Sequence, residues 1–499
     1  MTSINSDFMS QLALRSLGNS SNMMTQAMER LSTGKRVNSA ADDAAGLGIA
    51  TKLKAQVNSL NAATRNATDA LALIGTIDGA LEESGEILLR MRELAVQSAS
   101  DTNTGTDRSF IQDEINALNN ELNRISSSTE FNAVKLLDGT YNNKSIQIGT
   151  GANQVFNIGV TATDSTTLGA YQRESTAEAT AAKASATTAN AAINSLVTAS
   201  ADYVVKGSFG STTVKVDAGA DARDVAQSFN LSAGTTGITA AAITKANITA
   251  ISAADTFSFT LKGKSATAST VNATVTSATN LTSLKDAINS VSGATGITAS
   301  LTQDLSGVNL VQQDGYDIVF GDVDSASTGT MSVAAADKAG TTLGSAVALG
   351  GTTTTDSIGI IGQISLSSHK AFTITPGVNT NHFSTGSTAV TSSLSTMGAV
   401  DISSQNGATN ALSVIDGALA MISEIRSEMG AAENRLTSTV DNLSNVSVNT
   451  QRSLTSVEDA NFASETSALT KAQILQQAAT SMLAQANKAK QTMLVLLQG

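Results

Sequence analysis

The chain has 499 residues, of which 3% are aromatic, with no tryptophan, no cysteine and a formal net charge of −12. The lack of cysteine excludes disulfide frameworks, thiolate catalysis and cysteine-ligated zinc or iron–sulfur sites, and the acidity without a long basic run disfavours nucleic acid and anionic membranes as partners. Because large side chains are so few, stability must come from long helices, extended sheets or other subunits.

The first zone, residues 1–150, has the periodicity of helices. Residues 1–34 place apolar side chains at spacings of three, four and seven, which predicts an amphipathic helix with a stripe of Leu14, Leu17, Met24, Met28 and Leu31. From Ala44 to about Ser100 apolar residues recur every seven positions in a coiled-coil-like pattern made by Leu53, Leu60, Ala67, Ile74, Leu81, Leu88 and Ala95. A helix of this length would be roughly 85 Å long.

A third helix and a β-hairpin complete this zone. The polar segment "SDTNTGTD" precedes another apolar stripe at helical spacing, made by Ile111, Ile115, Leu118, Leu122 and Ile125. The alternation in "SIQIGTGANQVFNIGV" then predicts a β-hairpin at about 145–160.

The middle zone, about 172–400, is rich in Thr, Ser, Ala and Gly, with strand-like alternation in "YVVKGSF", "TTVKVDA", "TFSFTLKG", "NATVTSA" and "YDIVFGDV". Residues 177–194 are of low complexity and are compatible with a helix or a linker. The zone contains an internal repeat with a shift of 59 residues, which matches Val225, Phe229, Asn230 and "TGIT" at 236–239 to Leu284, Ile288, Asn289 and "TGIT" at 295–298. Two related α+β subdomains or one composite domain fit this repeat, since two copies are too few for a solenoid.

The last zone, about 401–499, mirrors the first. Apolar residues again recur every seven positions, at Ile415, Ile422, Met429, Leu436 and Leu443. A final helix follows residues 449–462 and carries, among its apolar residues, Leu475, Leu483, Met493, Leu494 and Leu497. Because a long apolar stripe must be buried, we expect the two zones to pair as a rod that brings both termini to one end, with the middle zone inserted at the other end.

The expected fold is therefore multidomain α plus β, with long antiparallel coiled-coil-like helices from both chain ends and a β-rich (α+β) central insertion. The expected domains are 1–34 with 460–499, 35–171 with 401–459, and 172–400, the last with two related subdomains. The outermost helices have apolar stripes and mostly uncharged polar faces. Short helices depend on tertiary burial, so we expect them to be frayed in the monomer and to order when neighbouring subunits cover them.

Residues 28–46, "MERLSTGKRVNSAADDAAG", crowd charged and polar side chains between two helices. Arg36, Asn38, Asp42 and Asp43 can cap helix ends and pair across interfaces. "AAGLG" follows no strand and has no Walker lysine, so it is a weak phosphate loop. A structural joint is the favoured interpretation of this stretch over a site for chemistry.

Other candidate sites are weaker. His369 and His382 have no HExxH around them, and "DVDS" at 322–325 offers too few ligands at fixed spacing for a calcium loop. No catalytic, metal or cofactor constellation is visible, so an enzyme is the least favoured class. There is no apolar run long enough for a membrane span, and the N-terminus lacks the basic and apolar regions of a Sec-type signal peptide.

Five blocks of sequence resemble bacterial flagellin. "LSTGKRVNSAADDAAGLGIATKL", "LRMRELAVQSASDTNT" and "LNRISSSTEFNAVKLLDGT" are similar to its N-terminal region, and "MGAAENRLTSTVDNL" and "TKAQILQQAATSMLAQAN" are similar to its C-terminal region. The resemblance covers roughly 1–170 and 400–499, and the 59-residue repeat is similar to a β-rich module of flagellin central regions.

The resemblance implies a structural subunit that self-assembles into the flagellar filament and needs no cofactor. It implies an extracellular filament, export by the flagellar type III route without a cleaved signal, and contacts with hook-associated junction and cap proteins and with an export chaperone at the C-terminal helix. The self-assembly interface then comprises the stripe of 1–34, the polar residues of the joint, and Leu475, Leu483, Met493, Leu494 and Leu497.

"LRMRELAVQ" also resembles the patch that Toll-like receptor 5 reads on flagellins. Arg90, Leu94, Gln97 and Glu114 match that pattern, with Leu94 as an apolar anchor on a polar helix face. Two alternatives stay open at this point. One is a hook–filament junction protein, which has similar ends, and the other is a surface adhesin that binds host glycans or protein through the middle zone.

Overall fold

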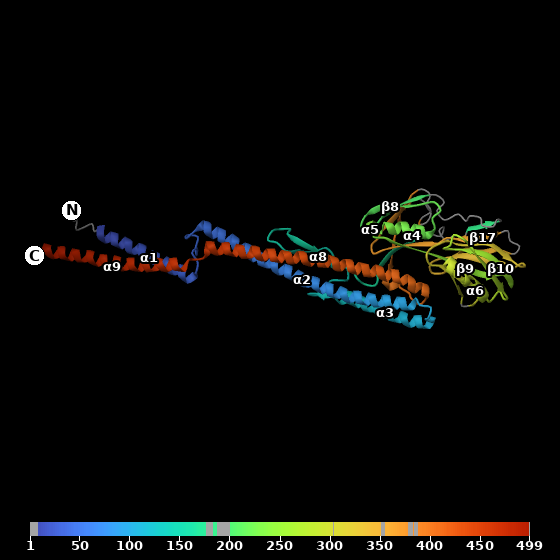
Figure 1. Ribbon diagram of the computed structural model, residues 1–499. Helices are drawn as coiled ribbons and strands as arrows, with labels where there is room; N and C mark the ends of the chain where they lie inside the picture. The colour runs from blue at the N-terminus through green and yellow to red at the C-terminus, as the bar shows by residue number, and fades with distance from the viewer. Residues whose placement is uncertain are drawn as a thin grey trace. The chain divides into compact units, whose positions relative to one another are not determined.

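The computed structural model describes residues 8–175, 183–186, 200–302, 304–350, 355–377, 383 and 388–498 (Figure 1). It divides into two compact units. The first unit comprises Met1–Gly75, Asn143–Ile158 and Gly430–Gly499, and the second comprises Thr76–Asn142 and Gly159–Met429. The two longest helices of the described chain, α2 (Ala44–Ser98) and α8 (Gln405–Glu458), contribute residues to both units.

In the first unit, α1 (Phe8–Thr33) and α9 (Phe462–Gln498) lie side by side (Figure 1). They are antiparallel, because Arg30 pairs with Glu465 and, just beyond the ends of the two helices, Lys35 pairs with Glu458. In the same unit, the Asn61 side chain of α2 accepts a hydrogen bond from Ser447 of α8 at 3.1 Å, so these two helices also meet there.

The predicted hairpin is confirmed as β3 (Lys144–Gln147) paired with β4 (Val155–Ile158). Both long helices hold it in the first unit. Asn66 of α2 donates a hydrogen bond to the Gln147 carbonyl at 2.9 Å, and the Arg435 guanidinium of α8 lies 4.8 Å from the centroid of the Phe156 ring. The cation–π contact and the apolar alternation of β4 fix the hairpin on the helices.

In the second unit, α2 and α8 are again antiparallel and are joined by α3 (Gly105–Ser128). Asp78 faces Arg426 and Arg92 faces Asp416, so rising numbers on α2 meet falling numbers on α8. The heptad prediction is confirmed here, since the buried core includes Leu81, Leu88, Ala95, Ile415 and Ile422. The N-terminus of α3 has a full capping box, in which Thr104 and Asp107 exchange hydrogen bonds. A two-residue bridge follows α3, with β1 (Glu130–Phe131) paired with β2 (Val134–Lys135).

The middle zone of the second unit forms antiparallel sheets. One sheet has the order β20-β19-β7-β8, with β20 Val390–Thr391, β19 Thr373–Pro376, β7 Ala201–Lys206 and β8 Ser211–Val216. Another has the order β11-β10-β14-β17-β6, with β11 Ser269–Val275, β10 Asp255–Lys262, β14 Ile318–Ser325, β17 Thr355–Ile360 and β6 Lys183–Ala186.

A third sheet is larger than these two. Its order is β12-β13-β9-β18-β5-β21, with β12 Ile297–Leu301, β13 Val308–Gln312, β9 Thr239–Ile251, β18 Gln363–Ser368, β5 Gly169–Glu174 and β21 Ser393–Thr396. β15 (Met331–Ala336) also pairs with β9, and β16 (Thr342–Leu349) pairs with β15. The chain enters this sheet through β5 and leaves it through β21, which are neighbours, and a short 3₁₀ helix (Met397–Ala399) then leads to α8.

The internal repeat is confirmed as two matching substructures. The first runs from the β7–β8 pair into α4 (Ala222–Leu231) and α5 (Ala233–Thr236), and the second runs from the β10–β11 pair into α6 (Thr282–Ser290) and α7 (Ser292–Thr295). Each short helix ends at a left-handed glycine, Gly237 (φ +72°) or Gly296 (φ +69°), as the repeated "TGIT" requires.

The repeated asparagine explains the spacing between helix and strand. Asn230 donates to the Ala240 carbonyl and accepts from the Ala240 amide, both at 2.8 Å, while Asn289 makes the same pair of bonds to Ala299 at 2.9 and 2.8 Å. Each copy has its own apolar core, with Phe229 in one and Ile288 in the other. β9 connects the two copies through its pairing with both β13 and β18.

Two expectations from the sequence need correction or limits, and one disfavoured candidate site can be placed in the fold. Most of the low-complexity segment 177–194 lies outside the described residues, but 183–186 form strand β6 rather than a helix or a linker. "DVDS" at 322–325 is the end of strand β14, so it is not a calcium loop. α8 continues to Glu458, so most of segment 449–462 is helical, with Leu454 buried.

Candidate functional site

The polar stretch between α1 and α2 forms a joint with the segment between α8 and α9. We call residues 34–43 together with 457–461 the joint; all of them lie in the first unit. Its two strands of backbone pair directly, since the Arg36 amide donates to the Glu458 carbonyl at 2.7 Å and the Ala460 amide donates to the Gly34 carbonyl at 2.9 Å. Gly34 has φ +70°, a left-handed conformation that favours glycine at the end of α1.

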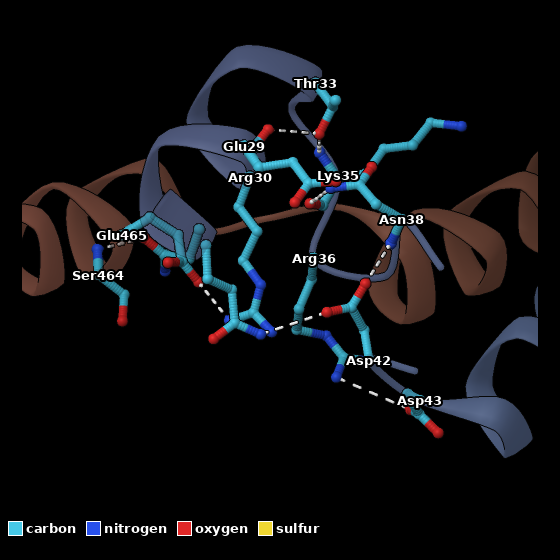
Figure 2. Close-up of polar contacts among 12 residues, drawn as sticks. Glu29, Arg30, Thr33, Lys35, Arg36, Asn38, Asp42, Asp43, Ser464 and Glu465 are labelled. Atoms are coloured by element: carbon cyan, nitrogen blue, oxygen red, sulfur yellow. Dashed lines mark hydrogen bonds and ion pairs between the residues drawn. The ribbon is translucent and has the colours of Figure 1, made fainter. Parts of the chain in front are cut away.

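Side chains strengthen this pairing. The Arg36 guanidinium donates to the Val457 carbonyl at 2.7 Å, and the Lys35 ammonium forms an ion pair with Glu458. Arg30, on the last turn of α1, bonds to Glu465 on the first turn of α9 at 3.2 Å (Figure 2). Val37 is buried at the centre of the joint. The predicted structural joint thus connects the segment that follows α1 to the segment that precedes α9.

The two adjacent aspartates have separate structural roles. Asp43 is the N-cap of α2, because its carboxylate accepts from the Gly46 amide at 2.8 Å. A Cβ at Gly46 would lie 2.3 Å from Asp43 Oδ2, so glycine is required there while the cap is in place. Asp43 also lies 3.9 Å from Arg36, which ties the start of α2 to the joint.

Asp42 folds the loop onto itself. Its carboxylate accepts from the backbone amide and the hydroxyl of Ser39, both at 2.9 Å, and from Gln26 of α1 at 3.2 Å. The backbone hydrogen bond from Ser39 is the main cause that holds the pKa of Asp42 below its usual range, helped by the Ser39 hydroxyl and Gln26. Asn38 donates to the Lys35 carbonyl at 3.2 Å. All four predicted joint residues therefore have structural partners that bring α1, the loop and α2 together.

The predicted apolar stripe of α1 does not form the seam with α9. Leu14 and Met28 are about half exposed, at 53% and 49%, and Leu17, Met24 and Leu31 are half-buried. The residues that are buried between these helices are small, namely Ser20, Ala27, Ala472 and Ala479. A spacing of seven between Ser20 and Ala27, and again between Ala472 and Ala479, is the signal that the sequence analysis missed, because small residues carry little weight in an apolar pattern.

α9 shows the same arrangement. Leu475 is exposed and Leu483 is half-buried, and the exposed large apolar residues of this helix also include Phe462, Ile474 and Met482. A shallow groove on α9 is lined by Thr466, Ser467, Thr470, Lys471, Ile474 and Leu475. Met493, Leu494 and Leu497 lie on the α9 backbone, but their side chains fall outside the described residues.

The proposed receptor patch is only partly on the surface. Arg90 and Glu114 are exposed and joined at 2.8 Å across α2 and α3, and Gln97 is exposed. Leu94 is 2% exposed and belongs to the core of the helical bundle, so the expectation of an apolar anchor on this face is wrong. A heptad neighbour, Ala95, is also buried, and the two side chains fill the space between the helices instead.

Sites for chemistry are not supported among the residues described. His369 lies 3.6 Å from Glu424, and His382 falls outside the described residues. Within the described part of the chain, no group of His, Cys, Asp and Glu side chains is arranged to hold a metal ion. A search of the described helices finds none with the length and apolar character needed to cross a bilayer.

Comparison with known proteins places these features in a family. The family model of the bacterial flagellin N-terminal helical region matches residues 4–142, that of the C-terminal helical region matches 412–497, and that of the flagellin hook IN motif matches 256–314. The chain is 38% identical to B-type flagellin of Pseudomonas aeruginosa and 30% identical to flagellin D of Vibrio anguillarum, each over 99% of both chains.

Solved structures give weaker matches. FliC from Burkholderia pseudomallei is 17% identical with a TM-score of 0.29, and the match covers 73% of this chain and 99% of that one. The flagellar junction protein FlgL from Legionella pneumophila is 13% identical with a TM-score of 0.30, over 82% of this chain and 98% of that one.

Proposed function

Because this chain belongs to the bacterial flagellin family and is a structural subunit of the flagellar filament, we propose that α1, α9 and the joint hold its polymer together. The relatives that match along the whole chain are flagellins, so a junction protein or an adhesin is not the favoured function. Flagellins are structural proteins that polymerise with themselves, and their filament lies outside the cell.

The observation that carries the proposal is the exposure of apolar side chains on the outermost helices. Phe8, Leu12, Leu14, Met23 and Met28 on α1, and Phe462, Ile474, Leu475 and Met482 on α9, are exposed large apolar residues. The fully buried residues between α1 and α9 are small, namely Ser20, Ala27, Ala472 and Ala479. Apolar surface gains about 25 cal/mol for each Å² removed from water, so neighbouring subunits that cover these helices would stabilise both the helices and the polymer.

This supports coupled folding and assembly. A helix pair with a seam of alanine and serine is marginal by itself, and covering its outer face provides the missing burial. In this proposal, 1–34 with 460–499 form the inner layer of the filament, 35–171 with 401–459 form the outer helical layer, and 172–400 faces solvent. The joint transmits the arrangement of one layer to the other, because its ion pairs and backbone bonds connect both helix pairs.

Electron microscopy of the purified full-length chain, seeded with filament fragments, tests the proposal. A variant that lacks 1–34 and 460–499 runs beside it. We expect the full-length chain to polymerise and the shortened chain to stay monomeric with its helical signal from residues 35–459 retained. Polymers of the shortened chain, formed as readily as those of the intact one, would overturn the proposal.

Point variants test the joint separately. We expect Arg36→Ala and Asp43→Ala to leave the monomer soluble and to reduce filament yield, because each removes a contact between the two helix pairs. Lys264→Ala in the middle zone is a control, since Lys264 is exposed and lies outside α1, α9 and the joint. Normal yield and heat resistance of filaments in both joint variants would remove the joint from the proposal.

Export and partner contacts extend the proposal. The groove on α9, with exposed Ile474 and Leu475, suits an apolar contact with the export chaperone before assembly. Export then proceeds through the flagellar type III route without a cleaved signal, and junction and cap proteins meet the ends of the filament. Ile474→Asp should abolish co-purification with the chaperone, whereas Lys471→Gln, in the same groove, should not; equal recovery of both variants argues against this contact.

Toll-like receptor 5 is a further proposed partner of the monomer. The polar face that supports it consists of Arg90, Gln97 and Glu114, without Leu94. Arg90→Ala should lower the response of a receptor reporter assay to purified monomer, and Arg124→Ala, which removes an exposed ion pair elsewhere on α3, serves as the control. A full response to Arg90→Ala monomer argues against the patch.

A further inference from the structure

An amine and a carboxamide from distant parts of the chain meet in the second unit. Lys245 lies on β9 and Asn406 lies on the first turn of α8, 161 residues later. Lys245 Nζ lies 2.6 Å from Asn406 Oδ1 and 2.6 Å from the Lys338 carbonyl oxygen, to both of which it donates. Asn406 Nδ2 in turn donates to the Ala339 carbonyl at 2.9 Å. The turn between β15 and β16 therefore holds both groups against each other.

The surroundings of Lys245 favour its reactive form. The residue is 8% exposed, and burial lowers the pKa of its amine to about 8. The charged groups that act on this amine are Asp337, which raises the pKa, and Lys338, which lowers it; both lie at the β15–β16 turn. About one amine in ten is therefore neutral at pH 7, and a neutral, desolvated lysine is a nucleophile.

We propose that Lys245 and Asn406 form an intramolecular isopeptide bond. Nζ of Lys245 attacks Cγ of Asn406, a C–N bond forms, and the bond from Cγ to Nδ2 breaks. The attacking nitrogen loses one proton and the departing nitrogen gains one, with solvent water as the carrier, so one ammonia leaves. The reaction needs no oxidant, reductant or other reactant, because amine and carboxamide exchange one amide for another.

The geometry holds the partners together and leaves one movement to make. The hydrogen bond from Nζ reaches Oδ1, so the carboxamide must turn about its Cβ–Cγ bond until one face of the Cγ carbonyl meets the amine. This rotation breaks the bond from Nδ2 to the Ala339 carbonyl, and Asn406 is half-buried rather than fully enclosed. Holding both groups in contact replaces a bimolecular encounter and gives a high effective concentration.

A competing reaction at Asn406 is hindered. An asparagine that precedes a glycine can lose ammonia by attack of the glycine backbone nitrogen, which leads to deamidation. Here the Gly407 nitrogen lies in the first turn of α8 and donates to Ser404 Oγ at 3.1 Å. The helical backbone directs this nitrogen away from Cγ, whereas the lysine amine lies against the carboxamide.

The bond would clamp the β-rich region to the helical bundle. β9 is the strand that both repeat copies share, and α8 is the helix that follows the exit of the chain from the large sheet. A covalent link between them closes a loop from 245 to 406 and resists pulling forces at the base of the β-rich region. Because the partners meet only after β9, the β15–β16 turn and α8 have folded, the bond forms after folding and does not hinder the passage of an unfolded chain.

Mass spectrometry of the full-length chain tests the proposal. We expect the intact mass to fall by one ammonia during incubation at pH 8, with a branched tryptic peptide that joins the segments around Lys245 and Asn406. The rate should rise about tenfold from pH 6 to pH 7, in step with the neutral fraction of an amine of this pKa. Retention of the full mass with both peptides unlinked at pH 9 would overturn the proposal, and so would a small gain in mass at Asn406, which marks deamidation.

Variants separate the bond from general effects on folding. Lys245→Arg and Asn406→Ser should each abolish the loss of ammonia with the circular dichroism spectrum unchanged. Asn247→Ser is the matched control, because Asn247 also binds this turn, at the Gly340 carbonyl and Thr342 hydroxyl, without contacting Lys245 Nζ. Loss of ammonia from Lys245→Arg or Asn406→Ser at the rate of the unaltered chain would overturn the proposal.

Discussion

The two antiparallel helix pairs of this chain differ in whether their apolar residues are buried or exposed. α2 and α8 bury the residues of their heptads, including Leu88 and Ile415, which are fully covered. α1 and α9 carry a higher density of leucine and methionine but leave many of them exposed, with alanine and serine fully buried between the helices. A long apolar repeat within one pair thus serves the fold of the subunit, whereas the exposed residues of the other pair are available to other subunits.

The seam explains why the outer pair behaves differently. Ala27 and Ala472 allow close approach of α1 and α9 but remove little apolar area from water. The half-buried ion pair from Arg30 to Glu465 adds direction to this packing. The same chain therefore combines a stable bundle with a pair of helices that need a partner.

The largest expected contrast comes from matched leucines. Leu88→Ala in α2 should lower the free energy of unfolding of the monomer by about 3 kcal/mol, because it leaves a cavity in the buried bundle. Leu14→Ala on α1 should change it by less than about 0.5 kcal/mol, as expected for an exposed site, while reducing polymerisation. Denaturant titration followed by circular dichroism measures the first effect and sedimentation measures the second. Equal loss of monomer stability in both variants would contradict the distinction between the pairs.

The next contrast concerns the start of α2. Asp43→Ala removes the bond to the Gly46 amide and should lower stability by about 1 kcal/mol, the usual value of an N-cap. Asp43→Asn keeps the cap and removes the charge that faces Arg36, so it should retain the stability and isolate the ionic contribution to assembly. Thermal unfolding of the monomer distinguishes the two, and an equal loss in both variants would show that the charge matters more than the cap.

A smaller effect is expected from an ion pair within the bundle. Arg426 contacts Asp78 at 2.8 and 3.3 Å with both nitrogens of its guanidinium fork, but the side chains are partly exposed. A double-mutant cycle with Arg426→Ala and Asp78→Ala should give a coupling of about 0.5 kcal/mol. Salt should reduce this value, and a coupling that is unaffected by salt would point to packing instead.

The smallest effect is the acid response of the joint. The folded pKa of Asp42 lies below its unfolded value, so its contribution to stability is present at neutral pH and is lost as pH falls through the folded pKa, below the usual value of 3.8. Asp42→Asn filaments should therefore lose less stability than the unaltered filaments as the pH falls below about 4. Light scattering during acid titration measures this, and Asp401→Asn, an exposed residue outside the joint, is the control.

Most of the helices and strands, and about half of the residues of the candidate site, could be predicted from the sequence. The heptads of α2 and α8, the hairpin at 144–158 and the 59-residue repeat were all readable because they are local patterns. The joint residues were found because capping chemistry is local as well. Leu94 was misplaced, since a residue next to a heptad position can turn toward a third helix that the sequence does not position.

By itself, the sequence determined where helices and strands lie, that the central zone is duplicated, and that no thiol or metal chemistry based on cysteine exists. Only the tertiary structure decided that Ala27 and Ala472 form the seam, that Asp43 caps α2, and that Lys245 meets Asn406. The physical reason is that periodicity records which face of an element is apolar, over three to seven residues. Which partner covers that face, and which polar groups meet across 161 residues, depends on how the whole chain closes on itself.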